Sequence, residues 1–152
     1  MIDHADIEDA LLAALAVLHQ DQGGPLRTLQ ASGAISLEEL KQTSSTRPAP
    51  LCLAVSTGAQ PSPLRPGNHY EAVHTITLLL AARSFRSRQT AVRGDLDRVG
   101  VYDLLAATRQ VLLGRDILGP AASEMRPGHE WLLTSSPTLV IWGQEWQLTV
   151  YH

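Results

Sequence analysis

Residues 99–114, VGVYDLLAATRQVLLG, decide the fold class of this 152-residue chain. Apolar side chains recur there every three or four positions, which is the pattern of an amphipathic helix with one buried face. The positions expected to face inward are Val101, Leu104, Leu105, Thr108, Val111 and Leu112. Gly114 is suited to end the helix, because glycine adopts the left-handed backbone conformation without strain.

Strand-like segments flank this helix on both sides. Residues 70–83 alternate between two faces, and the alternation becomes fully apolar toward Leu80, which predicts a long strand with one deeply buried end. Residues 26–31 and 51–55 predict two shorter strands upstream. Further strands are expected downstream at 131–133 and 139–151, and Gly143 is expected to mark a bulge or bend.

A first helix is predicted from Asp3 or Asp6 to about His19, and residues 36–40 fit a helix of one or two turns. Several of the strands are adjacent in sequence and joined by loops. We therefore expect a single α+β domain over 1–152, with a mainly antiparallel sheet and two principal helices packed on one face.

Composition restricts the class of protein. The chain is 44% hydrophobic and 18% charged, and it has no apolar run long enough to span a bilayer, so we expect a soluble protein with no membrane partner. Its acidic start does not resemble a signal peptide. The one cysteine, Cys52, is expected to be a buried small hydrophobe in a reducing cytoplasm. A net charge of -3 gives no general case for nucleic-acid binding.

Motifs that would support enzymatic chemistry are incomplete. His129 and Glu130 begin a zinc-protease pattern, but Leu133 occupies the position of the second histidine ligand. His69 and His74 are five residues apart near a predicted strand and are expected to face opposite sides. No glycine-rich phosphate-binding motif occurs. We therefore predict no catalytic residue, no metal and no cofactor.

Two segments are candidates for an interface. Residues 56–68 are rich in glycine, serine and proline, which predicts a long exposed loop; its candidate contact residues are Pro61, Pro63, Leu64, Arg65 and Pro66. Residues 83–93 form a predicted basic arm that carries Arg83, Arg86, Arg88 and Arg93. Guanidinium groups bind carboxylates and phosphates, so this arm suits an acidic protein surface, or alternatively nucleic acid; it could equally be a solvated hairpin end. The three tryptophans, at 131, 142 and 146, are expected to pack in the core or on the sheet.

The order of elements, with the sequence GVYDLL at 100–105 followed by Arg109 and LLG at 112–114, resembles the tail terminator family of Mu-like phages. This resemblance covers nearly the whole chain. It implies a structural protein that forms a ring, expected to be a hexamer, which caps the tail tube. Its implied partners are further copies of itself, the tail tube protein and a head or neck completion protein, without sequence-specific nucleic acid. It would be found in the host cytoplasm during assembly and then in the virion tail.

Overall fold

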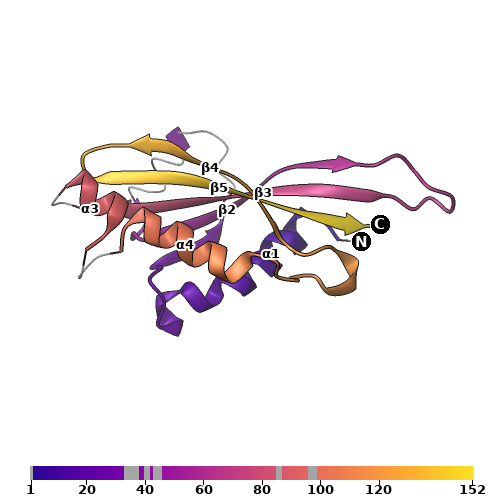
Figure 1. Ribbon diagram of the computed structural model, residues 1–152, viewed down its shortest axis with the longest axis horizontal. Helices are drawn as coiled ribbons and strands as arrows, with labels where there is room; N and C mark the ends of the chain where they lie inside the picture. The colour runs from indigo at the N-terminus through magenta and orange to yellow at the C-terminus, as the bar shows by residue number, and fades with distance from the viewer. Residues whose placement is uncertain (1, 33–37, 40–41, 43–45, 85–86, 96–98) are drawn as a thin grey trace.

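Five strands form one sheet in the computed structural model, which describes residues 2–32, 38–39, 42, 46–84, 87–95 and 99–152 (Figure 1). Within these residues the spatial order is β1-β2-β3-β5-β4. The strands are β1 (Thr28–Ala31), β2 (Leu51–Pro61), β3 (Glu71–Arg83), β4 (Arg126–Ser135) and β5 (Leu139–Tyr151). Neighbours are antiparallel except for β1 and β2, which run parallel. The predicted α+β class is confirmed.

The helices begin and end at residues whose side chains or backbone suit those positions. α1 (His4–Leu15) starts at Asp3, whose carboxylate accepts from the Asp6 amide at 2.9 Å, and the Asp6 carboxylate accepts from the Asp3 amide in return. α3 (Arg88–Arg93) starts at Ser87. α4 (Val101–Leu112) is followed by Gly114 at φ +69°, as predicted. The short 3-10 turns are η1 (Ala16–Leu18), η2 (Gln20–Gln22) and η3 (Gly119–Ala121).

The main core lies between the helices and one face of the sheet. α1 and α4 both pack on this face, as predicted, and the inward positions of α4 are buried except for the partly buried Val111. The sheet contributes alternate side chains of three strands: Cys52, Ala54, Ile76, Leu78, Leu80, Val140, Trp146, Leu148 and Val150. Both principal helices therefore cover one side of one sheet.

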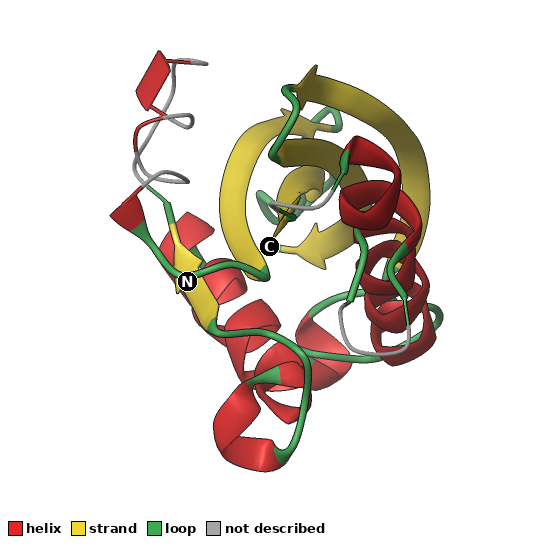
Figure 2. Ribbon diagram, turned by 90° about the vertical axis from the view of Figure 1, so that its left-hand side faces the viewer, coloured by secondary structure: helices red, strands yellow, loops and turns green. Residues whose placement is uncertain are grey.

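A second apolar cluster lies on the other face of the sheet, at its centre. It contains Leu51, Leu53, Leu79, Ala81 and Ile141, all buried. Viewed along its length, the sheet is strongly curved (Figure 2). Strands that are buried on both faces need continuous apolar runs, which explains why β3 loses its alternation toward Leu80.

Gly143 lies in regular strand, so the bulge predicted there is wrong. β3 and β5 pair without a register shift from Glu71 opposite Tyr151 to Arg83 opposite Leu139. The glycine is accounted for by packing, since a side chain at 143 would overlap the indole ring of Trp131 on the neighbouring strand. The register shifts of this region lie in β4 instead.

The loop predicted over 56–68 is wrong for 56–61, whereas 62–68 form an exposed turn as expected. Residues 56–61 continue β2 and pair with β3 as far as Pro61 opposite Ala72, with one register shift at Thr57. The backbone of β3 supplies a hydrogen-bonding partner that the glycine-rich composition of this segment does not reveal. We call residues 56–76 the hairpin arm, which extends beyond the helices at one end of the molecule (Figure 1). The helix predicted at 36–40 lies mostly outside the described residues.

Candidate interaction surfaces

The hairpin tip, residues 61–70, is an ordered turn that projects from the arm. Gly67 and Asn68 have positive φ angles, and the Arg65 amide donates to the His69 carbonyl at 2.7 Å across the turn. The Arg65 guanidinium lies 3.5 Å from the Glu71 carboxylate. The candidate contact residues Pro61, Pro63, Leu64, Arg65 and Pro66 are all exposed here. Leu64, at 69% exposure, is the most exposed large apolar side chain of the described residues.

The outer edge of the hairpin arm is open. β1 pairs with β2 only over Leu51–Ala54, so no strand of the described residues pairs with β2 beyond that point on this side. Beside this edge, a polar hollow of about 410 Å³ lies over the outer parts of β2, β3 and β5. It is lined by Thr57, Gly58, Ala59, Gln60, Val73, Thr75, Glu145 and Gln147. Open strand edges favour pairing with another chain.

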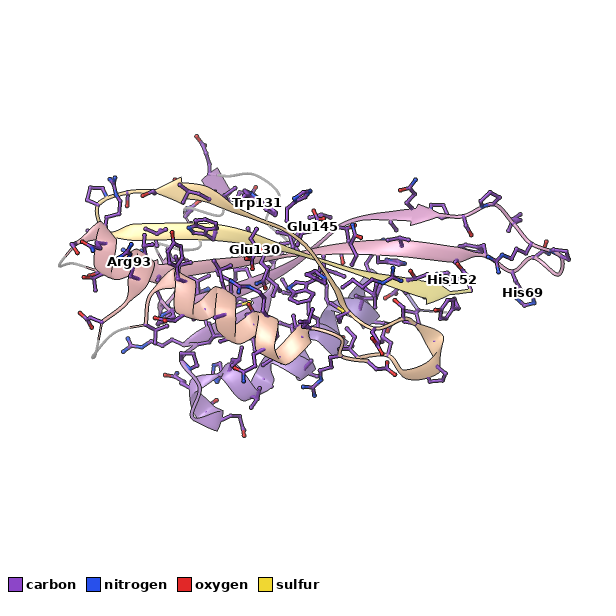
Figure 3. The ribbon with its side chains drawn as sticks, in the orientation of Figure 1. His69, Arg93, Glu130, Trp131, Glu145 and His152 are labelled. Atoms are coloured by element: carbon purple, nitrogen blue, oxygen red, sulfur yellow. The ribbon has the colours of Figure 1, made fainter. Side chains whose placement is uncertain are left out.

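The arginines predicted to form a basic arm lie at the opposite end of the molecule. Figure 3 places His69 of the tip and Arg93 at the two ends of the long axis. Arg83 is the partly buried last residue of β3, and Arg88 and Arg93 are exposed at the two ends of α3. Arg86 lies outside the described residues. Residues 88–93 form α3, and Ala91 of this helix packs in the main core. This segment is therefore neither an extended basic arm nor a solvated hairpin end.

α3 is held to the sheet by a polar contact as well as by Ala91. The Arg88 side chain donates from Nε to the Ser136 carbonyl at 3.3 Å, next to the turn between β4 and β5. The guanidinium of Arg93 remains exposed. Docking of Arg88 and Arg93 to an acidic surface, or to nucleic acid, remains a prediction.

An exposed apolar patch lies at this same end, where α4 crosses β4 and β5. We call Tyr102, Leu132 and Trp142 the apolar patch. The Tyr102 and Trp142 rings pack edge to face with centroids 5.7 Å apart, and Leu132 pairs directly with Trp142 across the two strands. Tyr102 is 46% exposed and Leu132 is 52% exposed. This patch could not be predicted from the sequence, because Tyr102 lies off the inward face of its helix and Leu132 is thirty positions away.

A buried polar network holds α4 against the sheet beside the apolar patch. The Gln144 side chain is 1% exposed and uses all its hydrogen-bonding capacity. Its oxygen accepts from Thr108 at 2.7 Å and from the Trp146 indole at 2.8 Å. Its amide nitrogen donates to the Leu105 carbonyl at 3.2 Å and to Glu130, whose carboxylate also accepts from Arg109 at 2.9 Å. The sequence analysis missed this network too, since its members come from three distant segments.

Comparison with known families identifies the chain. Residues 3–150 match the family described as Bacteriophage Mu, Gp37. The chain belongs to this family. The resemblance to proteins of Mu-like phages is thereby confirmed, whereas the family description does not state a tail-terminating role. No curated protein matches the chain.

The titratable groups of this Gp37 family member give no reactive centre within the described part of the chain. Cys52 is fully buried, as predicted, and burial raises the pKa of its thiol to about 12. His74 is 5% exposed, and its ring packs against His4 with centroids 5.0 Å apart. Burial, and then the neighbouring His4 and His152, lower the pKa of His74. No group of three or more potential ligands in the described residues could hold a metal ion, and none of the described helices is long and apolar enough to cross a membrane.

The three tryptophans contribute differently to these surfaces. Trp146 is fully buried in the main core, and Trp131 packs over Gly143, so the core and sheet-face interpretation is confirmed for both. Trp142 packs against the core only in part and leaves its other side to the apolar patch. The surfaces of this family member that could meet a partner are therefore the hairpin arm, the exposed end of α3 and the apolar patch.

Proposed function

We propose that this protein is the tail terminator of a Mu-like phage or prophage. In this proposal it assembles in the host cytoplasm into a ring, which we expect to be a hexamer. The ring caps the finished tail tube and joins the tail to the head or neck, and it becomes part of the virion. Membership of the Bacteriophage Mu, Gp37 family over nearly the whole chain is the observation that carries the proposal.

The shape of the molecule supports a ring-forming role. Two of its exposed apolar features lie toward opposite ends of one long sheet, Leu64 at the hairpin tip and the apolar patch near the other end. Unlike surfaces at opposite ends favour head-to-tail contacts, and such contacts generate closed rings when the rotation between copies closes. A protein of this kind acts through its interfaces and needs no reactive centre.

The exposed arginines of α3 suit a contact with a different protein. Arg88 and Arg93 present guanidinium groups at the end of the molecule away from the hairpin tip. Guanidinium groups form paired hydrogen bonds with carboxylates, so an acidic surface of the tail tube protein or of the neck protein would fit them. In this proposal these arginines contribute to docking of the ring, and Arg88 also holds α3 to the sheet.

Mass and imaging measurements test the ring. Static light scattering on the purified protein should give a mass that is a whole multiple of the 16.5 kDa chain, with rings visible in negative-stain images. Because some rings form only on their tube, tails purified from the phage should be imaged as well. A monomer at high concentration, together with tails that lack a terminal ring, would refute the proposal.

A genetic experiment tests the capping step separately. A phage deprived of this gene should make tubes of uncontrolled length that do not join heads, because nothing stops subunit addition. The wild-type gene supplied in trans should restore tails of normal length. Normal tails without the gene would exclude a terminator role even for a ring-forming protein.

A further inference from the structure

We infer that the contact between neighbouring copies in the ring is made by the hairpin tip of one copy, with Leu64 at its centre, seated on the apolar patch of the next copy. The patch consists of Tyr102, Leu132 and Trp142. This inference rests on the proposed function, because it specifies the interface of the proposed ring. It names a second copy of this chain as the occupant of the patch.

The hairpin tip has the properties of a preorganised anchor. Leu64 is exposed between Pro63 and Pro66, both of which restrict the backbone of the turn. The Arg65–His69 hydrogen bond and the Arg65–Glu71 ion pair close the turn. A segment that is already ordered loses little conformational entropy on binding, so burial of its apolar side chain contributes more fully to affinity.

The apolar patch has the properties of the complementary site. Its side chains come from α4, β4 and β5, so they are placed by regular structure rather than by loops. Glu130 and Gln144 tie these three elements together directly beside the patch. Tyr102 is exposed and Trp142 is partly buried, and such rings in a rigid setting are typical of the residues that dominate binding energy at protein interfaces.

The position of the two features explains why a second copy is the expected occupant. β3 runs from the hairpin tip to the end that carries the patch, where Leu80 pairs with Trp142. The tip therefore points away from the patch of its own chain (Figure 1). Two complementary features at opposite ends fit together only between different copies, and each copy then has one tip and one patch engaged, which gives a closed ring when the rotation between copies closes.

Charge favours the same pairing. The tip carries Arg65, which follows Leu64; its guanidinium is exposed and also lies 3.5 Å from the Glu71 carboxylate of the same chain. Asp103 follows Tyr102 in α4 and is exposed, and its carboxylate also accepts a hydrogen bond from the Gly100 amide at 3.0 Å. The guanidinium of Arg109 beside the patch is paired with Glu130, so it presents little net repulsion to the tip. Opposite charges at the rim of an apolar contact help to set its orientation.

Cysteine cross-linking tests the contact. The variants Leu64→Cys and Leu132→Cys are co-expressed on separate chains and treated with a short bismaleimide; native Cys52 is fully buried and does not interfere. We expect a covalent dimer from the mixture and none from either variant alone. The double variant L64C/L132C should give a ladder that ends in a covalently closed ring. Val17→Cys, at an exposed apolar position on η1, should not cross-link to Leu64→Cys.

A charge substitution measures the contribution of the anchor. Leu64→Asp should weaken self-association by about ten- to a hundred-fold, the range expected when burial of one leucine is lost. Thermal unfolding of the unassociated chain should be unchanged, because Leu64 is exposed there. Leu113→Asp is the matched control, since this leucine is equally exposed at the end of α4 but outside the patch, and its effect on association should be small.

The outcomes separate this inference from the proposed function. Rings without a cross-link between positions 64 and 132 would overturn the inference and leave the terminator proposal standing. Dimers from Leu64→Cys alone would also overturn it, because they would show a symmetric contact between two tips. A cross-linked pair without any ring would support the contact and refute the ring. Neither rings nor cross-links would refute both.

Discussion

The buried amide of Gln144 allows a quantitative test of how α4 is attached to the sheet. We predict that Gln144→Leu lowers the free energy of unfolding by about 2 to 4 kcal/mol. Leucine has a similar volume, so the substitution leaves no large cavity and tests hydrogen bonding almost alone. The Trp146 indole, fully buried, would lose its acceptor at 2.8 Å, and Glu130 would lose a donor.

The magnitude follows from the groups that are left unpaired. A buried donor without an acceptor costs about 1 to 3 kcal/mol, and a hydrogen bond to a charged group contributes about 1.5 to 3 kcal/mol. Thr108 partly compensates, because its hydroxyl can donate to the Leu104 carbonyl at 2.9 Å instead. Glu130 keeps Arg109 as a partner. These compensations place the expected loss below the simple sum of the two terms.

Urea unfolding monitored by tryptophan fluorescence measures this loss, and the melting temperature should fall by roughly 5 to 15 °C. Gln147→Leu is the matched control on the same strand, because Gln147 lines the polar hollow on the other face. Its effect should stay within about 0.5 kcal/mol. A double-mutant cycle with Thr108→Val should show coupling between Thr108 and Gln144. Equal effects of the Gln144 and Gln147 substitutions would refute the network.

Three further outcomes follow from the core and its titratable groups. Leu112→Ala should lower the free energy of unfolding by about 2 to 5 kcal/mol in urea titrations, since Leu112 is fully buried; a loss below about 0.5 kcal/mol would contradict the register of α4. Cys52 should react with a thiol reagent only after denaturation, because its buried thiol has a pKa of about 12; rapid reaction in native buffer would contradict its burial. Below about pH 6.5 the unfolded chain binds a proton at His74 more readily than the native chain does, because burial, His4 and His152 lower the native pKa. Stability should therefore fall as the pH drops through this range until the native pKa is passed, and His74→Phe should reduce this dependence in pH-resolved urea titrations.

The elements that could be predicted from the sequence are those defined by local periodicity. The helix at 101–112 and the strand at 71–83 each bury one face in the main core, so their apolar residues repeat at 3.6 or 2 positions. The N-terminal helix also has a local start signal in Asp3 and Asp6. In all three cases the information lies within a dozen neighbouring residues.

The features that could not be predicted depend on contacts between distant segments. The outer half of β2 has the composition of a loop and is a strand because β3 lies beside it, which reflects how far strand formation depends on pairing. Gly143 suggests a bulge in the sequence, but the structure shows that the ring of Trp131 occupies the space that a side chain at 143 would fill. The apolar patch joins Tyr102 to residues of two later strands, so no window of sequence contains it.

The unbroken pairing of β3 with β5 determines where the hairpin tip and the apolar patch lie relative to each other. The two strands pair over thirteen residues without a register shift, which corresponds to about 40 Å of unbroken ladder at the usual rise per residue. The hairpin tip lies at one end of this ladder and the apolar patch lies near the other end. The twist and curvature of the ladder therefore fix the orientation of the tip relative to the patch within one chain. Register shifts occur in β2 and β4, which flank the ladder. If tip and patch meet between copies, the rotation from one copy to the next, and with it the number of copies in the ring, is set by the curvature of this ladder together with the geometry of the contact.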